Sequence, residues 1–270
     1  MATIVEPAAS PPEAGNRQIS ERRPRSRFYL ALALVCAAIA IGGFAPSYWL
    51  QLPAGTFKGA PLLHIHGVLA TAWVLFLISQ SRLVVRGSVA RHRDWGLVGI
   101  SLASVLTVVA VMVAIAAMNA KVEEGQGDAA RAFLIVPLSG ILMFAGFTAA
   151  AVANFRRPEW HRRLMIVGTV ALLGAAMARV IFFFAVGGGP GVRPGLMPSL
   201  PPPAMPLVSD LLLQLILVAG MVHDKRRLGS VHRAWIYGFA ILTAVTILRV
   251  PAGQTDAWLA IAGWLGRING

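Results

Sequence analysis

The stretch WGLVGISLASVLTVVAVMVAIAAM, from Trp95 to Met118, decides the class of this protein because it contains no charged residue. A helix needs about 20 consecutive apolar residues to cross the hydrocarbon core of a bilayer. The polar run Arg91-His92-Arg93-Asp94 comes directly before this stretch. Such a run is typical of a transmembrane helix that begins among the lipid headgroups.

Comparable apolar stretches recur on both sides of this one. The whole chain is 57% hydrophobic and only 13% charged, whereas soluble domains are about half apolar and a quarter charged. This composition excludes a water-soluble globule and predicts an all-α protein with seven transmembrane helices, of which the sixth is short. The predicted spans are Phe28–Leu50, Leu62–Val85, Trp95–Met118, Ala132–Asn154, Leu164–Val186, Pro206–Val222 and Ala234–Val250.

The basic residues are distributed unequally between the two sides of these spans. Of 24 Lys and Arg residues, 17, including Arg163, lie in the N-terminal tail and in the segments on its side. Six, including Arg249 at the end of the seventh span, are assigned to the other side, and Arg179 lies inside a span. Basic residues favour the cytoplasmic side, so we predict a cytoplasmic N-terminus and an outer C-terminus in a bacterial-type inner membrane. The net charge of +13 then reflects orientation and anionic lipids rather than nucleic acid. The expected partner is the lipid bilayer, with other membrane proteins left open.

The two ends of the chain differ from the predicted transmembrane domain, residues 28–250. Residues 1–27 are rich in Pro, Glu, Ser and Arg and are expected to form a disordered cytoplasmic tail. Gly187–Met205 is rich in Gly and Pro and is expected to form an extended outer loop. In the outer tail, residues 251–270, an apolar helical face predicts a short helix along the membrane interface. That face consists of Trp258, Ile261, Ala262, Leu265 and Ile268.

A His-Arg pair opens three of the outward-running helices. The pairs are His92-Arg93, His161-Arg162 and His232-Arg233, spaced about 70 residues apart. This regularity predicts one leading helix followed by three related helical hairpins. One interpretation of the pairs is interfacial, with Arg reaching the lipid phosphates and His capping the helix.

The other interpretation of these residues is a cofactor site. His92, His161, His223 and His232 belong to the same leaflet, and a tight loop brings the last two near each other. Two histidines from different helices can ligate a haem b iron or hold a metal ion, and neighbouring Arg side chains can neutralise haem propionates. The first functional hypothesis is therefore a haem- or metal-binding redox or oxidase-associated membrane protein.

Polar residues inside the spans give a second hypothesis, because ionisable groups in hydrocarbon normally face the bundle interior and have a partner. Arg179 follows His161 by about five helical turns and would share its face on a continuous helix. Asp210 is the predicted partner of Arg179, and Gln214 lies one turn deeper on the same face. The alternative to a binding role is that this contact is a structural ion pair that holds two helices together.

His66 completes the candidate pocket. It shares a helical face with Trp73 and Gln80, whereas His64 points in another direction. A carrier or small-molecule-binding protein would then use His66, Arg179, Asp210 and Gln214. A structural membrane protein without a ligand is the third hypothesis. The sequence contains no HExxH, GxSxG or Walker motif that would assign a reaction.

Four segments resemble uncharacterised bacterial multi-pass membrane proteins that carry a domain of unknown function. These segments are Leu63-His64-Ile65-His66-Gly67, Arg91-His92-Arg93-Asp94-Trp95-Gly96, Glu159-Trp160-His161-Arg162-Arg163-Leu164-Met165 and Ala178-Arg179. The resemblance extends over roughly Leu62 to Val250 and implies no activity. A looser similarity is to cytochrome b561-type proteins, in which histidines on neighbouring helices hold two b haems. Because His64 and His66 lie on one helix, that similarity confines any haem to the cytoplasmic half.

Overall fold

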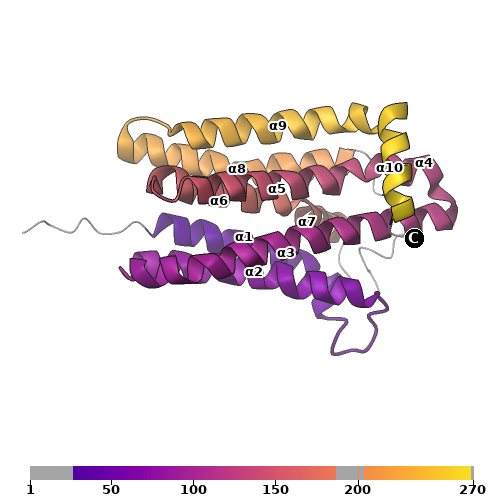
Figure 1. Cartoon of the computed structure of the whole chain (residues 1–270), viewed down its shortest axis with the longest axis horizontal. Helices are drawn as coiled ribbons and strands as arrows, with labels where there is room; N and C mark the ends of the chain where they lie inside the picture. The colour runs from indigo at the N-terminus through magenta and orange to yellow at the C-terminus, as the bar shows by residue number, and fades with distance from the viewer. Residues whose placement is uncertain (1–26, 187–199, 201–203, 269–270) are drawn as a thin grey trace, which may run out of the picture.

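The structure is a computed structural model that describes residues 27–186, 200 and 204–268. Its described residues form helices and no strands, so the protein is all-α as predicted. Figure 1 shows an elongated bundle of helices that run side by side, with the last helix lying across one end. The predicted tail, apart from Arg27, and most of the predicted outer loop lie outside the described residues.

The helices follow the predicted apolar stretches, with additional breaks. Within the described ranges, six segments are long and apolar enough to cross a membrane, and the bent pair α6 and α7 would make a seventh. The chain therefore has the character of a multi-pass integral membrane protein. The elements are α1 (Phe28–Phe44), the π-helical turn η1 (Ala45–Trp49), α2 (Pro61–Val85), α3 (Val89–Lys121), the turn η2 (Val122–Gln126), α4 (Gly127–Phe133), α5 (Ile135–Ala153), α6 (Pro158–Leu172), α7 (Gly174–Val186), α8 (Ala204–Leu228), α9 (Arg233–Gly253) and α10 (Asp256–Ile268).

The predicted fifth span is broken in its middle. Helices α6 and α7 meet at Leu173 with a bend of 53°. At Gly43 of α1, an added Cβ would overlap the carbonyl oxygen of Ala176, so α1 packs directly against the backbone of α7. The break changes which face α7 presents. The assumption of one continuous helix from His161 to Arg179 was therefore wrong.

The sixth span is longer than predicted. Helix α8 continues past Val222 to Leu228 and includes the charged residues Asp224 and Lys225. Asp224 is 1% exposed because a buried arginine neutralises its carboxylate, so the helix keeps a buried face beyond the apolar stretch. A prediction based on uninterrupted apolar residues therefore makes a helix too short where a charged residue is buried in an ion pair.

Consecutive helices contact each other in the pairs α2 and α3, α5 and α6, and α8 and α9, the pairs expected as hairpins. Helix α1 packs against α2, α6 and α7. At the centre, the Trp73 indole meets the Phe144 ring edge to face and donates a hydrogen bond of 3.2 Å to Thr169 Oγ1. Large apolar side chains such as Leu97 and Leu142 remain exposed on the outside, as expected for helices that face lipid.

The bundle has two distinct ends, which we call the His-Arg end and the α10 end. The His-Arg end contains the starts of α3, α6 and α9 with their His-Arg pairs. At the opposite end, α10 crosses the bundle beside α4 (Figure 1). The predicted terminal helix exists, but its predicted single face is divided. Trp258, Ala262 and Leu265 pack on the bundle, whereas Ile261 and Ile268 are exposed because they lie too far round the helix.

Candidate functional site

A pair of opposite charges lies between α8 and α9. Asp210 Oδ2 accepts hydrogen bonds from the Arg249 guanidinium and from Thr246 Oγ1. Only 4% of the Arg249 side chain is exposed, so this pair is inside the bundle. The predicted contact between Arg179 and Asp210 is therefore wrong, because Arg249 is the cation that reaches Asp210.

The sequence had placed Arg249 among the outer basic residues because the predicted seventh span ended at Val250. Helix α9 instead continues to Gly253. A Cβ at Gly253 would lie 2.8 Å from the Ala132 carbonyl oxygen, so α9 packs tightly against α4 at this point. The extended helix keeps Arg249 on the buried face.

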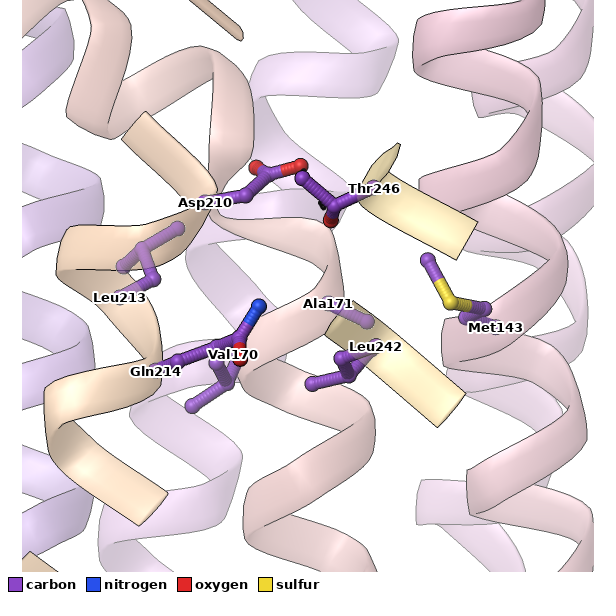
Figure 2. A pocket seen from close by; sticks show the side chains of 8 residues that line it. All are labelled: Met143, Val170, Ala171, Asp210, Leu213, Gln214, Leu242 and Thr246. Carbon is purple, nitrogen blue, oxygen red and sulfur yellow. Dashed lines mark hydrogen bonds between the residues drawn. The ribbon is translucent and has the colours of Figure 1, made fainter. Parts of the chain in front are cut away.

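A small cavity adjoins the Asp210–Arg249 pair. It offers about 10 Å³ to the centre of a water molecule, which is roughly the room that one water needs. Figure 2 shows Asp210 and Thr246 reaching toward one another, with the amide nitrogen of Gln214 pointing into the same space. The lining residues are Met143, Val170, Ala171, Asp210, Leu213, Gln214, Leu242 and Thr246.

Gln214 has hydrogen-bonding capacity left over at this cavity. Its Oε1 accepts a hydrogen bond of 2.6 Å from Thr243 Oγ1, but its buried Nε2 has no partner. Buried polar groups are normally hydrogen-bonded to protein or to ordered water. The cavity therefore presents an unused donor from Gln214 and an acceptor from Asp210 to whatever occupies it.

The cavity also adjoins the break between α6 and α7. Val170 and Ala171 line it from the last turn of α6. A Cβ at Gly174, the first residue of α7, would lie 2.9 Å from Asp210 Oδ1, so a larger residue there would require the carboxylate or the backbone to shift. Irregular backbone at membrane depth is tolerated where it is buried in protein or lines a cavity.

The other two predicted pocket residues lie elsewhere. The Arg179 guanidinium is 4.3 Å from the centre of the Phe44 ring, and its Nη1 donates to Ala175 O at 2.9 Å. His66 is near enough for the Arg179 charge to act on it, and its buried Nδ1 has no partner. The predicted pocket is thus divided. Asp210 and Gln214 line the cavity, whereas His66 and Arg179 do not.

Two of the four predicted cofactor histidines lie together at the His-Arg end. The rings of His92 and His161 are 6.0 Å apart between centroids and nearly perpendicular. His161 Nδ1 donates to the Ala151 carbonyl oxygen at 2.9 Å, so Nε2 is the ring nitrogen that this hydrogen bond leaves open to a ligand. His92 Nδ1 is buried without a partner.

The other two histidines have separate surroundings. His223 stacks on Phe28 with ring centroids 3.9 Å apart. His232 caps α9, because its Nδ1 accepts a hydrogen bond of 3.1 Å from Ala234 N. Burial lowers the pKa of His232, and the nearby Arg163 charge lowers it further, which favours the neutral ring that the cap requires. In the part of the chain that the structure describes, no group of three or more His, Cys, Asp or Glu is placed to hold a metal.

A second buried ion pair was missed by the sequence interpretation. Arg163 is fully buried, and its Nε and Nη2 donate to the two carboxylate oxygens of Asp224 at 2.9 and 2.7 Å. Its Nη1 donates to the backbone oxygen and the carboxylate of Glu159. Arg163 had been counted among the residues that set orientation. The isolated acid in the basic run from His223 to Arg227 was the available signal.

No protein-family model matches the chain, and comparisons with curated proteins and with solved structures found no match. The resemblances drawn from the motifs therefore remain predictions. The geometry of the described residues is what supports a function.

Proposed function

We propose that this protein is a carrier or a small-molecule-binding membrane protein, with its site at the cavity between α6, α8 and α9. The observation that carries the proposal is the pairing of an unpartnered buried donor, Gln214 Nε2, with the Asp210 carboxylate at one cavity. Both groups lie beside the break at Leu173. Broken helices commonly line the substrate sites of membrane transporters.

The size and charge of the cavity limit the ligand. Room for about one water indicates a small polar solute or ion, or a larger solute that binds after α7 moves at the break. Arg249 already balances the charge of Asp210, so the ligand does not have to be a cation. A solute that accepts a hydrogen bond from Gln214 and donates one to Asp210 matches the available groups.

Thermal unfolding of the purified protein tests this proposal against a panel of inorganic ions, carboxylic acids, amino acids and sugars. At least one solute should raise the Tm, because a ligand that binds only the folded state stabilises it, by about 2.7 kcal/mol at a hundred times its Kd. Gln214→Leu should abolish the response. Gln80→Leu, which changes another buried glutamine that is not part of the cavity lining, should keep it.

Uptake of the responding solute into proteoliposomes then separates a carrier from a binding protein. The proposal fails if no solute in the panel raises the Tm of the wild-type protein. It also fails if Gln214→Leu responds like the wild type. Either result would favour the third hypothesis, a structural membrane protein that binds no ligand.

A second candidate function is haem or metal binding at His92 and His161. It is favoured by the short distance between the two rings and by the Ala151 carbonyl oxygen, which orients His161. The purified protein should then show a Soret band or a stoichiometric metal that His161→Ala removes. His223→Ala should retain it, since His223 stacks on Phe28 instead. A folded protein with neither signal would reject this candidate.

We further propose seven spans in a bacterial-type inner membrane, with the His-Arg end in the cytoplasm. The excess of basic residues at that end supports this orientation. Ser230 and Thr255 are exposed in the connections at opposite ends of α9. In intact cells a membrane-impermeant maleimide should label Thr255→Cys and leave Ser230→Cys unlabelled. The reverse pattern would invert the proposed topology.

A further inference from the structure

A second pocket lies at the α10 end and shares no residue with the Asp210 cavity. It is bounded by the end of α3, η2, α4 and α10 and has a volume of about 230 Å³. This volume is below the roughly 300 to 1,000 Å³ of typical sites for whole small molecules. Its lining residues are Met118, Asn119, Val122, Glu123, Arg131, Gly263, Gly266 and Arg267.

The length of α3 places this pocket at the level of lipid headgroups. Helix α3 has 33 residues and is therefore about 50 Å long, well beyond the roughly 30 Å hydrocarbon core. Its apolar stretch ends at Met118, and Asn119 is the first polar residue after it. The pocket begins at these two residues, where the chain leaves the hydrocarbon.

The walls of the pocket are held together by specific contacts. Asn119 Nδ2 donates to Gly266 O at 3.0 Å, and Trp258 Nε1 donates to Arg131 O at 2.9 Å. A Cβ at Gly266 would lie 2.7 Å from Asn119 Oδ1, so glycine allows α10 to approach α3 this closely. The fully buried Ala262 anchors the same face of α10. The pocket is thus fixed by packing and hydrogen bonds on both sides.

Two cations and one acid line the pocket. Arg131 pairs with Asp128 at 2.6 Å through Nη1, and its Nε lies near the open face of Gly263. No ion pair to Arg267 occurs within the described ranges. Glu123 is the acid of the lining. Because Asp128 balances the charge of Arg131, Arg267 is the cation of the lining that has donors available for an anion.

We propose that this pocket binds the phosphate group of a phospholipid headgroup. Phosphate is the anion present at this depth of a membrane, and the planar fork of an arginine matches its oxygens in a bidentate arrangement. Ile261, Trp264 and Ile268 form an exposed apolar face on α10, which suits contact with the adjoining acyl chains. This inference is independent of the proposed function at Asp210.

Dihexanoyl-phosphatidylglycerol, titrated onto the full-length protein in an uncharged detergent, tests the proposal, with bound lipid measured by native mass spectrometry. The wild type should bind it saturably, and Arg267→Gln should weaken binding about tenfold because a charge-assisted contact is lost. Arg226→Gln, which removes an exposed cation at the His-Arg end, should bind like the wild type. Phosphate-free dihexanoylglycerol should not bind in the pocket.

A second variant keeps the test independent of charge. Gly263→Leu should block binding by filling the pocket, since a Cβ there meets only Arg131 Nε at 3.9 Å. Gly146→Leu, at an exposed glycine with nothing within 4 Å, is the matched control. Circular dichroism checks that both variants are folded.

Inorganic phosphate distinguishes the two sources of the anion. Competition by phosphate at the affinity of the lipid would support an anion site that does not need the glycerol and acyl groups. Binding of the lipid alone would identify the headgroup as the ligand. Equal binding of dihexanoylglycerol, or unchanged binding in Arg267→Gln and Gly263→Leu, would overturn the proposal.

Discussion

Among the described residues, the ion pairs Arg163–Asp224 and Asp210–Arg249 are both buried, but they differ in how completely their polar atoms are satisfied. In the pair at the His-Arg end, the guanidinium of Arg163 and the carboxylate of Asp224 are 0% and 1% exposed, and the nitrogens of Arg163 all have partners. In the pair toward the α10 end, Asp210 is 17% exposed and Arg249 Nε has no partner. The small cavity described above adjoins the second of these pairs.

The comparison of these two pairs shows that a buried charge does not by itself identify a ligand-binding site. A closed pair such as Arg163–Asp224 holds α6 against α8 and has no hydrogen bond left to offer. An open pair such as Asp210–Arg249, with Gln214 beside it, retains polar atoms that a water or a ligand can satisfy. Unsatisfied atoms at a cavity are therefore the better guide to function in this bundle.

The largest expected effect comes from opening the closed pair. Asp224→Asn should destabilise the protein by up to about 3–5 kcal/mol, because it removes the buried partner of Arg163 and leaves only the Glu159 carboxylate, which is 49% exposed, to balance that charge. Unfolding by SDS in mixed micelles measures the loss. The matched control Asp128→Asn removes an acid that is 71% exposed and should cost less than about 1 kcal/mol. If the two substitutions had equal effects, the Arg163–Asp224 pair would not be the contact that holds α6 against α8.

A substitution that crowds the Asp210–Arg249 pair should have an intermediate effect on the free energy of unfolding. Gly174→Ala places a methyl group 2.9 Å from Asp210 Oδ1, so the carboxylate or α7 must shift, at a cost of about 1–3 kcal/mol. The same SDS titration measures this cost. Gly146→Ala, where the added Cβ meets nothing within 4 Å, serves as the control. A fully tolerated Gly174→Ala would contradict the close approach of α7 to Asp210.

Gln214→Leu sharpens the comparison from the other direction. It removes a buried nitrogen that has no partner, so the free energy of unfolding should change by less than about 1 kcal/mol even though a hydrogen bond to Thr243 is lost. The response to the solutes proposed above should nevertheless disappear. A loss of stability comparable to that of Asp224→Asn would place Gln214 with the structural residues instead.

The smallest effect concerns pH and the cap of α9. The pKa of His232 is lower in the folded protein than its ordinary value of about 6.5, so folding favours the neutral ring. The contribution of the cap is fully present above that value and falls as the pH drops through it toward the folded pKa. A helix cap is worth about 1 kcal/mol.

The Tm measured from pH 8 to pH 5 tests this expectation. His232→Asn preserves a capping side chain but cannot titrate in this range, so its Tm should fall less than that of the wild type on acidification. Identical pH profiles for the two proteins would show that His232 does not contribute to the pH dependence.

The helices were predictable because long apolar runs and short basic segments depend on local sequence alone. Asp210 and Gln214 were placed on one face correctly, since α8 is unbroken between them. The partner of Asp210 was not predictable in the same way. The choice between Arg179 and Arg249 depended on the break at Leu173 and on the extension of α9 to Gly253. One glycine, Gly174, within an apolar stretch is not enough to predict a bend of 53° from the sequence.

The separation of Arg163 and Asp224 along the chain has a consequence for synthesis. The ribosome makes Arg163 61 residues before Asp224, so until α8 is made the acid that Arg163 can contact is the half-exposed Glu159 of its own helix. An arginine with donors left unsatisfied is costly among apolar helices. A chain that stops before α8 would therefore form an incomplete bundle in which Arg163 has donors without a partner. Synthesis of α8 supplies Asp224, and the ion pair then holds α6 against α8.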